Sequence, residues 1–178
     1  ILFLGGRLPN SSNAGGILYN DIIRIYGIEK FSFVTIENII DPSLVSKEVY
    51  ARPIKQYSIC IPPTNIILKI IKKIPIIESL YIFIKYSFLK NQILDYIIKE
   101  NYDMVFAPLR GEVMLLLPAL LKKTNIPLYG MVEDTVEREV DGPRLTYLLK
   151  RKYYYLLLCK VKKLGVAGET MQDLFKRR

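Results

Sequence analysis

The stretch ILFLGGRLPNSSNAGG, residues 1–16, decides how the rest of the chain is interpreted. Its first four residues are apolar and are followed at once by Gly5-Gly6, which is typical of a buried strand that ends in a turn. The remainder, Arg7 to Gly16, is rich in Pro, Asn, Ser and Gly and predicts a loop. From Ile17 to Tyr26 the apolar residues recur at helical spacing. The chain is therefore expected to begin with a strand, a glycine-bearing loop and a helix.

The same alternation continues along the chain. Further strands are predicted at residues 31–36, 56–61, 102–107, 127–132 and 164–167, and further helices at 64–74, 76–99, 112–123, 143–160 and 169–176. Gly27 is placed to end the first helix and Pro75 to open the longest one. Strands that alternate with helices favour a parallel sheet covered on both faces. We therefore predict a single α/β domain with a Rossmann-like sheet.

The composition fits a globular domain and excludes several kinds of chemistry. The chain has 178 residues, which is long enough to form one hydrophobic core. Of these residues, 51% are hydrophobic and 24% are charged, which is typical of a globular domain. It contains no histidine, so acid/base chemistry must fall to Asp, Glu, Lys or Tyr. Cys60 and Cys159 have no close partner in the sequence, and we expect neither a zinc site nor a disulfide.

The net charge of +9 is unevenly distributed. Residues 54–90 carry six basic groups and one acidic group, and residues 144–178 carry ten and two, whereas residues 91–143 carry five basic and nine acidic groups. Such segregation indicates an anionic partner at particular surfaces, although solvated helix faces would give the same pattern. No known nucleic-acid-binding module is visible, so we expect no nucleic acid among the partners.

The most apolar part of the chain, residues 64–99, suggests contact with a membrane surface. Pro75, Glu78, Lys85 and Lys90 interrupt it, so no run of about 18 apolar residues predicts a transmembrane helix. Lysines followed by aromatic residues favour an anionic membrane surface, and packing against the sheet explains the apolar positions equally well. These residues are Lys69, Lys72, Lys73, Tyr81, Phe83, Tyr86 and Phe88. The start of the chain shows no charged leader, and we expect a cytoplasmic location, with the inner face of the membrane as a peripheral alternative.

The glycine loop is the first candidate for a ligand site. Glycines at a helix start allow close approach of the backbone, and free amides with the helix dipole favour a phosphate or another anion. A turn whose glycines only satisfy backbone geometry is the other interpretation. The loop matches neither G-x-G-x-x-G nor G-x-x-x-x-G-K-S/T, which disfavours NAD and ATP.

Two further groups follow predicted strands and would share the same sheet edge, where ligands of open α/β sheets bind. Glu133 and Asp134 follow the fifth strand and would accept hydrogen bonds from hydroxyls, act as a base, or cap a turn. Arg110 follows the fourth strand and would bind a phosphate or sugar hydroxyls, or pair with Glu112 or Glu133.

In their order, these motifs resemble the N-terminal domain of GT-B type glycosyltransferases, particularly the large retaining group that uses nucleotide sugars. The resemblance covers nearly the whole chain. It rests on residues 1–16, on Asn101-Tyr-Asp-Met-Val-Phe-Ala107, on Asn125-Ile-Pro-Leu-Tyr-Gly-Met-Val-Glu-Asp134 and on residues 164–177. The chain departs from the family at Glu133, where a histidine often stands, and the sequence holds no second domain.

The resemblance implies roles for particular residues. Gly15 and Gly16 would lie near the donor phosphates or the transferred sugar, and Glu133 and Asp134, to which we add Arg110, would bind the acceptor. Glu169 and Thr170 would lie at the edge facing a second domain. No catalytic residue is assigned.

The resemblance also implies how the protein works as a whole. Residues 1–178 would form the acceptor-side domain of a two-domain enzyme, with most of the nucleotide-sugar site in an absent donor-binding domain. The full protein would transfer a sugar to an acceptor, such as a lipid-linked or cell-envelope glycan, with no cofactor or metal besides the nucleotide-sugar substrate. This chain alone is not expected to catalyse. The alternative is a noncatalytic binding or membrane-docking domain that retains the fold.

Overall fold

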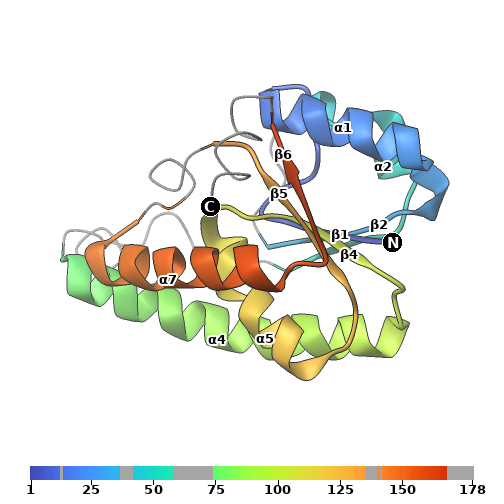
Figure 1. Ribbon diagram of the computed structural model, residues 1–178. Coiled ribbons are helices and arrows are strands. Elements are labelled where there is room, and N and C mark those ends of the chain that lie inside the picture. The colour runs from blue at the N-terminus through green and yellow to red at the C-terminus, as the bar shows by residue number, and fades with distance from the viewer. Residues whose placement is uncertain (13, 37–41, 58–73, 135–139, 141, 168–178) are drawn as a thin grey trace.

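Six parallel strands form one sheet in the order β3-β2-β1-β4-β5-β6 (Figure 1). The computed structural model describes the chain except for residues 13, 37–41, 58–73, 135–139, 141 and 168–178. The strands are β1 (Leu2–Gly5), β2 (Ser32–Thr35), β3 (Ile54–Gln56), β4 (Val105–Pro108), β5 (Leu128–Val132) and β6 (Lys163–Val166). This arrangement confirms the predicted α/β class and the Rossmann-like sheet.

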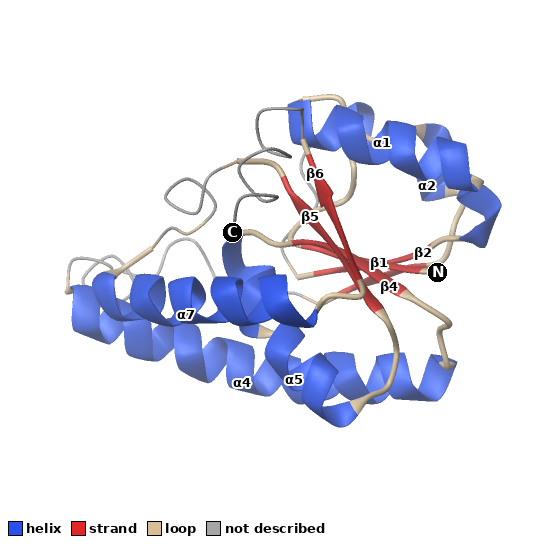
Figure 2. Cartoon of the chain, in the orientation of Figure 1, coloured by secondary structure: helices blue, strands red, loops and turns tan. Residues whose placement is uncertain are grey.

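Helices cover both faces of the sheet (Figure 2). The described helices are α1 (Ala14–Tyr26), η1 (Ile28–Lys30), η2 (Pro42–Leu44), α2 (Lys47–Tyr50), α4 (Pro75–Glu100), η3 (Gly111–Leu115), α5 (Leu117–Lys123) and α7 (Arg144–Lys160). α1 and α2 lie on one side of the sheet, and α4, α5 and α7 lie on the other. The described residues contain no helix whose length and hydropathy would allow it to cross a membrane.

The alternation of side chains along the strands divides the core into two parts. Phe3, Phe33 and Phe106 are register partners on β1, β2 and β4, and they form an aromatic row with Tyr19 of α1 on one face. The ring centre of Phe3 lies 5.7 Å from that of Tyr19 and 5.9 Å from that of Phe106. The aliphatic side chains of the other face pack against α4, α5 and α7. Both faces of the sheet are therefore filled.

Two predicted helices differ from the structure, each for a local reason. α1 begins at Ala14 rather than Ile17, so Gly15 and Gly16 lie in its first turn and not in the preceding loop. The predicted helix at 112–123 is divided into η3 and α5, with Pro118 in the first turn of α5. Proline has no backbone N–H with which to continue the helical hydrogen bonds, and this favours a break before it.

Of the other boundaries, the strand predicted at 102–107 begins three residues later, as β4, and the rest lie within two residues of the prediction or cannot be compared. β3 begins at Ile54, two residues before its predicted start, and ends at Gln56, while the predicted continuation at 58–61 lies outside the described residues. The predicted helix at 169–176 and residues 64–73 of the helix before Pro75 also lie outside them. α4 extends the predicted range 76–99 by one residue at each end, with Pro75 in its first turn.

Candidate functional site

A cavity of about 280 Å³ lies at the carboxyl edge of the sheet. It is lined by Ala14, Gly15, Leu18, Arg110, Glu133, Asp134 and Ala167. These residues come from the start of α1, the segments that follow β4 and β5, and the residue after β6. The topological switch point of the sheet lies between β1 and β4. From β1 the strand order runs outward through β2 and β3 on one side, and from β4 it runs outward through β5 and β6 on the other. The cavity therefore forms where open α/β sheets bind their ligands.

Glu133 is the centre of the site. The hydroxyl of Tyr19 donates a hydrogen bond to Oε1 of Glu133, and Nη1 of Arg110 donates to Oε2 at 2.8 Å. The Glu133 side chain is 15% exposed, so most of its surface is enclosed by these neighbours. Two charge-assisted contacts from separate elements fix the orientation of the carboxylate at the cavity wall.

Gly15 allows that carboxylate to approach the first turn of α1. A Cβ atom at Gly15 would overlap the carboxylate of Glu133. The positive end of the helix dipole favours a negative charge at this place. The predicted anion position near Gly15 is therefore taken up by a carboxylate of the chain itself. A donor phosphate at the same point would require Glu133 to turn away.

Arg110 stands at the rim of the cavity with half of its side chain exposed. Of the two partners predicted for it, Glu133 accepts its hydrogen bond, whereas Glu112 accepts one from Nζ of Lys150 at 2.9 Å. Lys150 is fully buried and the Glu112 side chain is 23% exposed, so the second pair is mostly enclosed by the protein. One pair thus shapes the cavity and the other joins η3 to α7.

Other predicted site residues lie elsewhere. Gly16 is buried against the backbone of Asn10, where a Cβ would overlap the Asn10 carbonyl oxygen, and it does not line the cavity. Glu169 and Thr170 are outside the described residues, as are Lys69, Lys72, Lys73 and Cys60. Cys159 is exposed. Within the described ranges no group of three or more Cys, Asp or Glu side chains is placed to hold a metal ion.

Tyr19 is a site residue that sequence reasoning missed. It lies four residues after Gly15, which places both on the same face of α1. The four-residue spacing between Gly15 and Tyr19 is the feature of the sequence that could have identified Tyr19. It was not used because Gly15 was predicted to lie in a loop, and helical spacing applies only if the helix begins at Ala14.

A separate group of tyrosines lies away from the cavity and has no identified role in it. Burial raises the pKa of Tyr96 well above its usual value, and the hydrogen-bonded hydroxyl of Tyr102, 3.2 Å away, adds to the effect. Burial, followed by the nearby Tyr102, also raises the pKa of Tyr57. With raised pKa values, the hydroxyls of Tyr57 and Tyr96 stay protonated around neutral pH and serve as structural groups.

No protein-family model matches the sequence, and no curated protein matches it. Among solved structures, the fold is similar to that of the plant UDP-glycosyltransferase UGT2 of Phytolacca americana in its apo form. The identity is 9% and the TM-score is 0.44, and the match covers 96% of this chain and 46% of that chain. The chain thus spans less than half the length of this neighbour.

Proposed function

We propose that the chain is the acceptor-side half of a glycosyltransferase of the GT-B type, one that takes its sugar from a nucleotide-sugar donor. The observation that carries this proposal is the cavity at the carboxyl edge of the sheet, where Gly15, Arg110, Glu133 and Asp134 meet. The resemblance to the retaining group of these enzymes, described from the sequence, implies an acceptor-binding role for Glu133 and Asp134 and a position near the donor for Gly15.

The side chains of the cavity suit a polyhydroxylated acceptor. Carboxylates such as those of Glu133 and Asp134 accept hydrogen bonds from hydroxyl groups, and a guanidinium donates to hydroxyl or ring oxygens. The volume of about 280 Å³ is slightly smaller than the roughly 300–1,000 Å³ that is usual for ligand pockets. In the proposed complex, one sugar unit of the acceptor occupies the cavity and the rest of the acceptor lies outside it.

In the proposed complex, the nucleotide-sugar donor lies on the side of Glu133 that faces away from the acceptor sugar. The leaving diphosphate needs cations or oriented amides as its negative charge develops, and the negative charge of a carboxylate beside the diphosphate would repel it. Arg110 is the cation that the cavity provides. The remaining cations would come from a second domain, so we expect the chain alone to release no nucleotide from a nucleotide sugar.

The test uses the full-length protein with a panel of nucleotide sugars and measures acceptor-dependent release of the nucleotide. We expect E133Q and D134N to raise the KM for the acceptor about tenfold or more, with the donor KM changed much less, because each removes a charged hydrogen-bond acceptor. The matched control is E48Q, which removes a surface carboxylate 3.6 Å from Arg24. If no nucleotide sugar is turned over, or if E133Q and E48Q behave alike, the proposal is wrong.

A further inference from the structure

A stripe of apolar side chains on α4 is exposed to solvent. Ile77, Leu80, Ile84 and Phe88 are 40%, 54%, 62% and 68% exposed. Their spacing of three and four residues places them on one face of the helix, opposite the buried Tyr86, Ile93 and Ile97. The same face continues with the exposed polar residues Asn91 and Asp95. The stripe is therefore continuous only in the first half of the helix, although Ile98, which is 49% exposed, lies on the same face near its C-terminal end.

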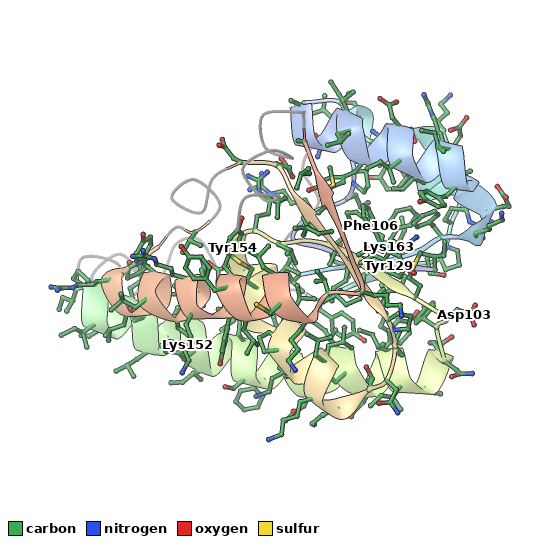
Figure 3. All side chains as sticks on the ribbon, viewed as in Figure 1. Asp103, Phe106, Tyr129, Lys152, Tyr154 and Lys163 are labelled. Atoms are coloured by element: carbon green, nitrogen blue, oxygen red, sulfur yellow. The ribbon has the colours of Figure 1, made fainter. Side chains whose placement is uncertain are left out.

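α7 combines exposed apolar residues with positive charge. Leu145, Leu148, Tyr155 and Leu156 are between 37% and 51% exposed. The helix has no acidic residue, and its cations Arg144, Arg151, Lys152 and Lys160 are exposed, whereas Lys150 is buried. Lys152 is exposed and Tyr154 is buried, and they project to different sides of α7 (Figure 3). The solvent side of this helix is thus both basic and apolar.

The two helices lie side by side on the same side of the sheet (Figures 1 and 2). α4 has 26 residues, which corresponds to roughly 39 Å, whereas a four-residue strand spans roughly 13 Å. Figure 1 shows the N-terminal halves of both helices extending beyond the strands. A helix that connects two parallel strands begins at the carboxyl edge of the sheet. The exposed stripe and the cavity therefore belong to the same end of the molecule.

We propose that the N-terminal half of α4 and the solvent side of α7 form a docking surface for an anionic lipid bilayer. The surface consists of the α4 stripe together with Arg144, Leu145, Leu148, Lys152, Tyr155 and Leu156. Apolar side chains flanked by Lys and Arg are the pattern of helices that lie in a membrane interface. The centre of a protein interface is depleted of lysine, which favours lipid over a second protein as the occupant.

This surface has a consequence for the acceptor, which rests on the proposed function. Docking through the N-terminal half of α4 and the solvent side of α7, both of which extend beyond the carboxyl edge of the sheet, brings that edge towards the bilayer. A saccharide attached to a lipid anchor then reaches the cavity of Glu133 while its anchor stays in the membrane. The surface therefore selects lipid-linked saccharides as the acceptor class.

The experiment measures flotation of the chain with vesicles of phosphatidylcholine alone and of phosphatidylcholine mixed with phosphatidylglycerol, at low and high salt. We expect binding to the anionic vesicles that weakens at high salt. The double variant I84Q/F88Q should bind at least about tenfold more weakly, because it removes the two most exposed members of the α4 stripe. The double variant R144Q/K152Q should bind roughly 25-fold more weakly at low salt, about fivefold for each cation.

Matched controls lie on other parts of the molecule. The exposed Ile17 and Ile25 are on α1, across the sheet, and I17Q/I25Q should bind as the original chain does. The exposed Lys122 and Lys123 end α5, and K122Q/K123Q should also bind unchanged.

Three outcomes overturn the docking surface: no binding to either vesicle, equal losses in test and control variants, or a stable dimer in solution that F88Q dissociates. Vesicle binding is measured without sugar transfer. If the chain does not bind vesicles, the proposed glycosyl transfer can still hold, with a water-soluble acceptor in place of a lipid-linked one. Binding without any nucleotide-sugar turnover by the full-length protein would instead favour a docking domain that lacks the chemistry.

Discussion

At the scale of single residues, Gly15 and Gly16 are adjacent but meet different neighbours. A Cβ at Gly15 would overlap a side chain that can rotate, that of Glu133, whereas a Cβ at Gly16 would overlap the backbone carbonyl of Asn10. Alanine gains up to about 1 kcal/mol of helix propensity over glycine in either position. We expect G16A to lower the free energy of unfolding by about 1–2 kcal/mol, because backbone overlap is costly. Urea denaturation of the purified variants measures this.

G15A is the matched variant and should leave the free energy of unfolding nearly unchanged. Its effect should fall on the cavity, because the carboxylate of Glu133 must move away from α1 and from Tyr19. Equal destabilisation by both alanines would show that Glu133 is held as rigidly as the backbone. In that case the carboxylate would belong to the framework of the fold.

The buried pair of Lys150 and Glu112 should contribute to stability as a unit. Removal of one partner of a buried ion pair leaves the other charge poorly compensated and costs about 3–5 kcal/mol. We expect K150M to cost about 3 kcal/mol, since one side of Glu112 still meets solvent. The double variant K150M/E112L should cost at least about 1 kcal/mol less than the sum of the single variants. Denaturation of all four proteins gives this coupling energy, and strict additivity would contradict it.

The residue scale also shows what sequence could and could not predict about the site. The sequence predicted the position of Arg110, Glu133 and Asp134, because each of them follows a predicted strand and parallel strands end at one edge of the sheet. The burial of Lys150 could not be predicted from the sequence. It is the first residue of the run Lys150-Arg151-Lys152, and composition alone does not distinguish the inward lysine from its neighbours. Only the rotation of α7 about its axis, which turns Lys150 towards Glu112 of η3, makes that distinction.

At the scale of the elements, helix ends were predicted best where a residue type restricts the backbone. Pro75 and the apolar period predicted α4 to within one residue at each end. The start of α1 was predicted three residues late, because Gly15 and Gly16 are poor helix formers. Here tertiary contact overrides propensity, since Glu133 and the Asn10 backbone require small residues at the helix start.

The C-terminal end of α4 offers an element-scale prediction. Asn101 caps the helix in the left-handed region with φ of 50°, where a residue with a Cβ is strained. We expect N101G to raise the free energy of unfolding by up to about 1 kcal/mol and N101A to lower it by about 1 kcal/mol. The difference should appear as a shift of the urea midpoint at constant m-value. If the alanine variant is as stable as the glycine variant, the helix must end in another conformation.

At the scale of the whole molecule, stability should decrease from the middle of the sheet to its edges. β1 and β4 are flanked by strands on both sides and are buried throughout, whereas β3 and β6 are the outermost of the described strands and consist of exposed or half-buried residues. Amides of central strands exchange with solvent only on global unfolding, and edge strands open locally. We expect the amides of β1 and β4 to exchange at least about 100-fold more slowly than those of β6.

Hydrogen exchange followed by mass spectrometry tests this gradient, with vesicle-bound chain as a second sample. Docking should add protection to α4 between Pro75 and Phe88 and to α7, and should leave α1 and β6 unchanged, because only the former carry the docking surface. Protection that spreads uniformly over both sides of the sheet would mean that the vesicles stabilise the fold without a defined contact. A β6 as slow to exchange as β1 would mean that this edge is covered in solution.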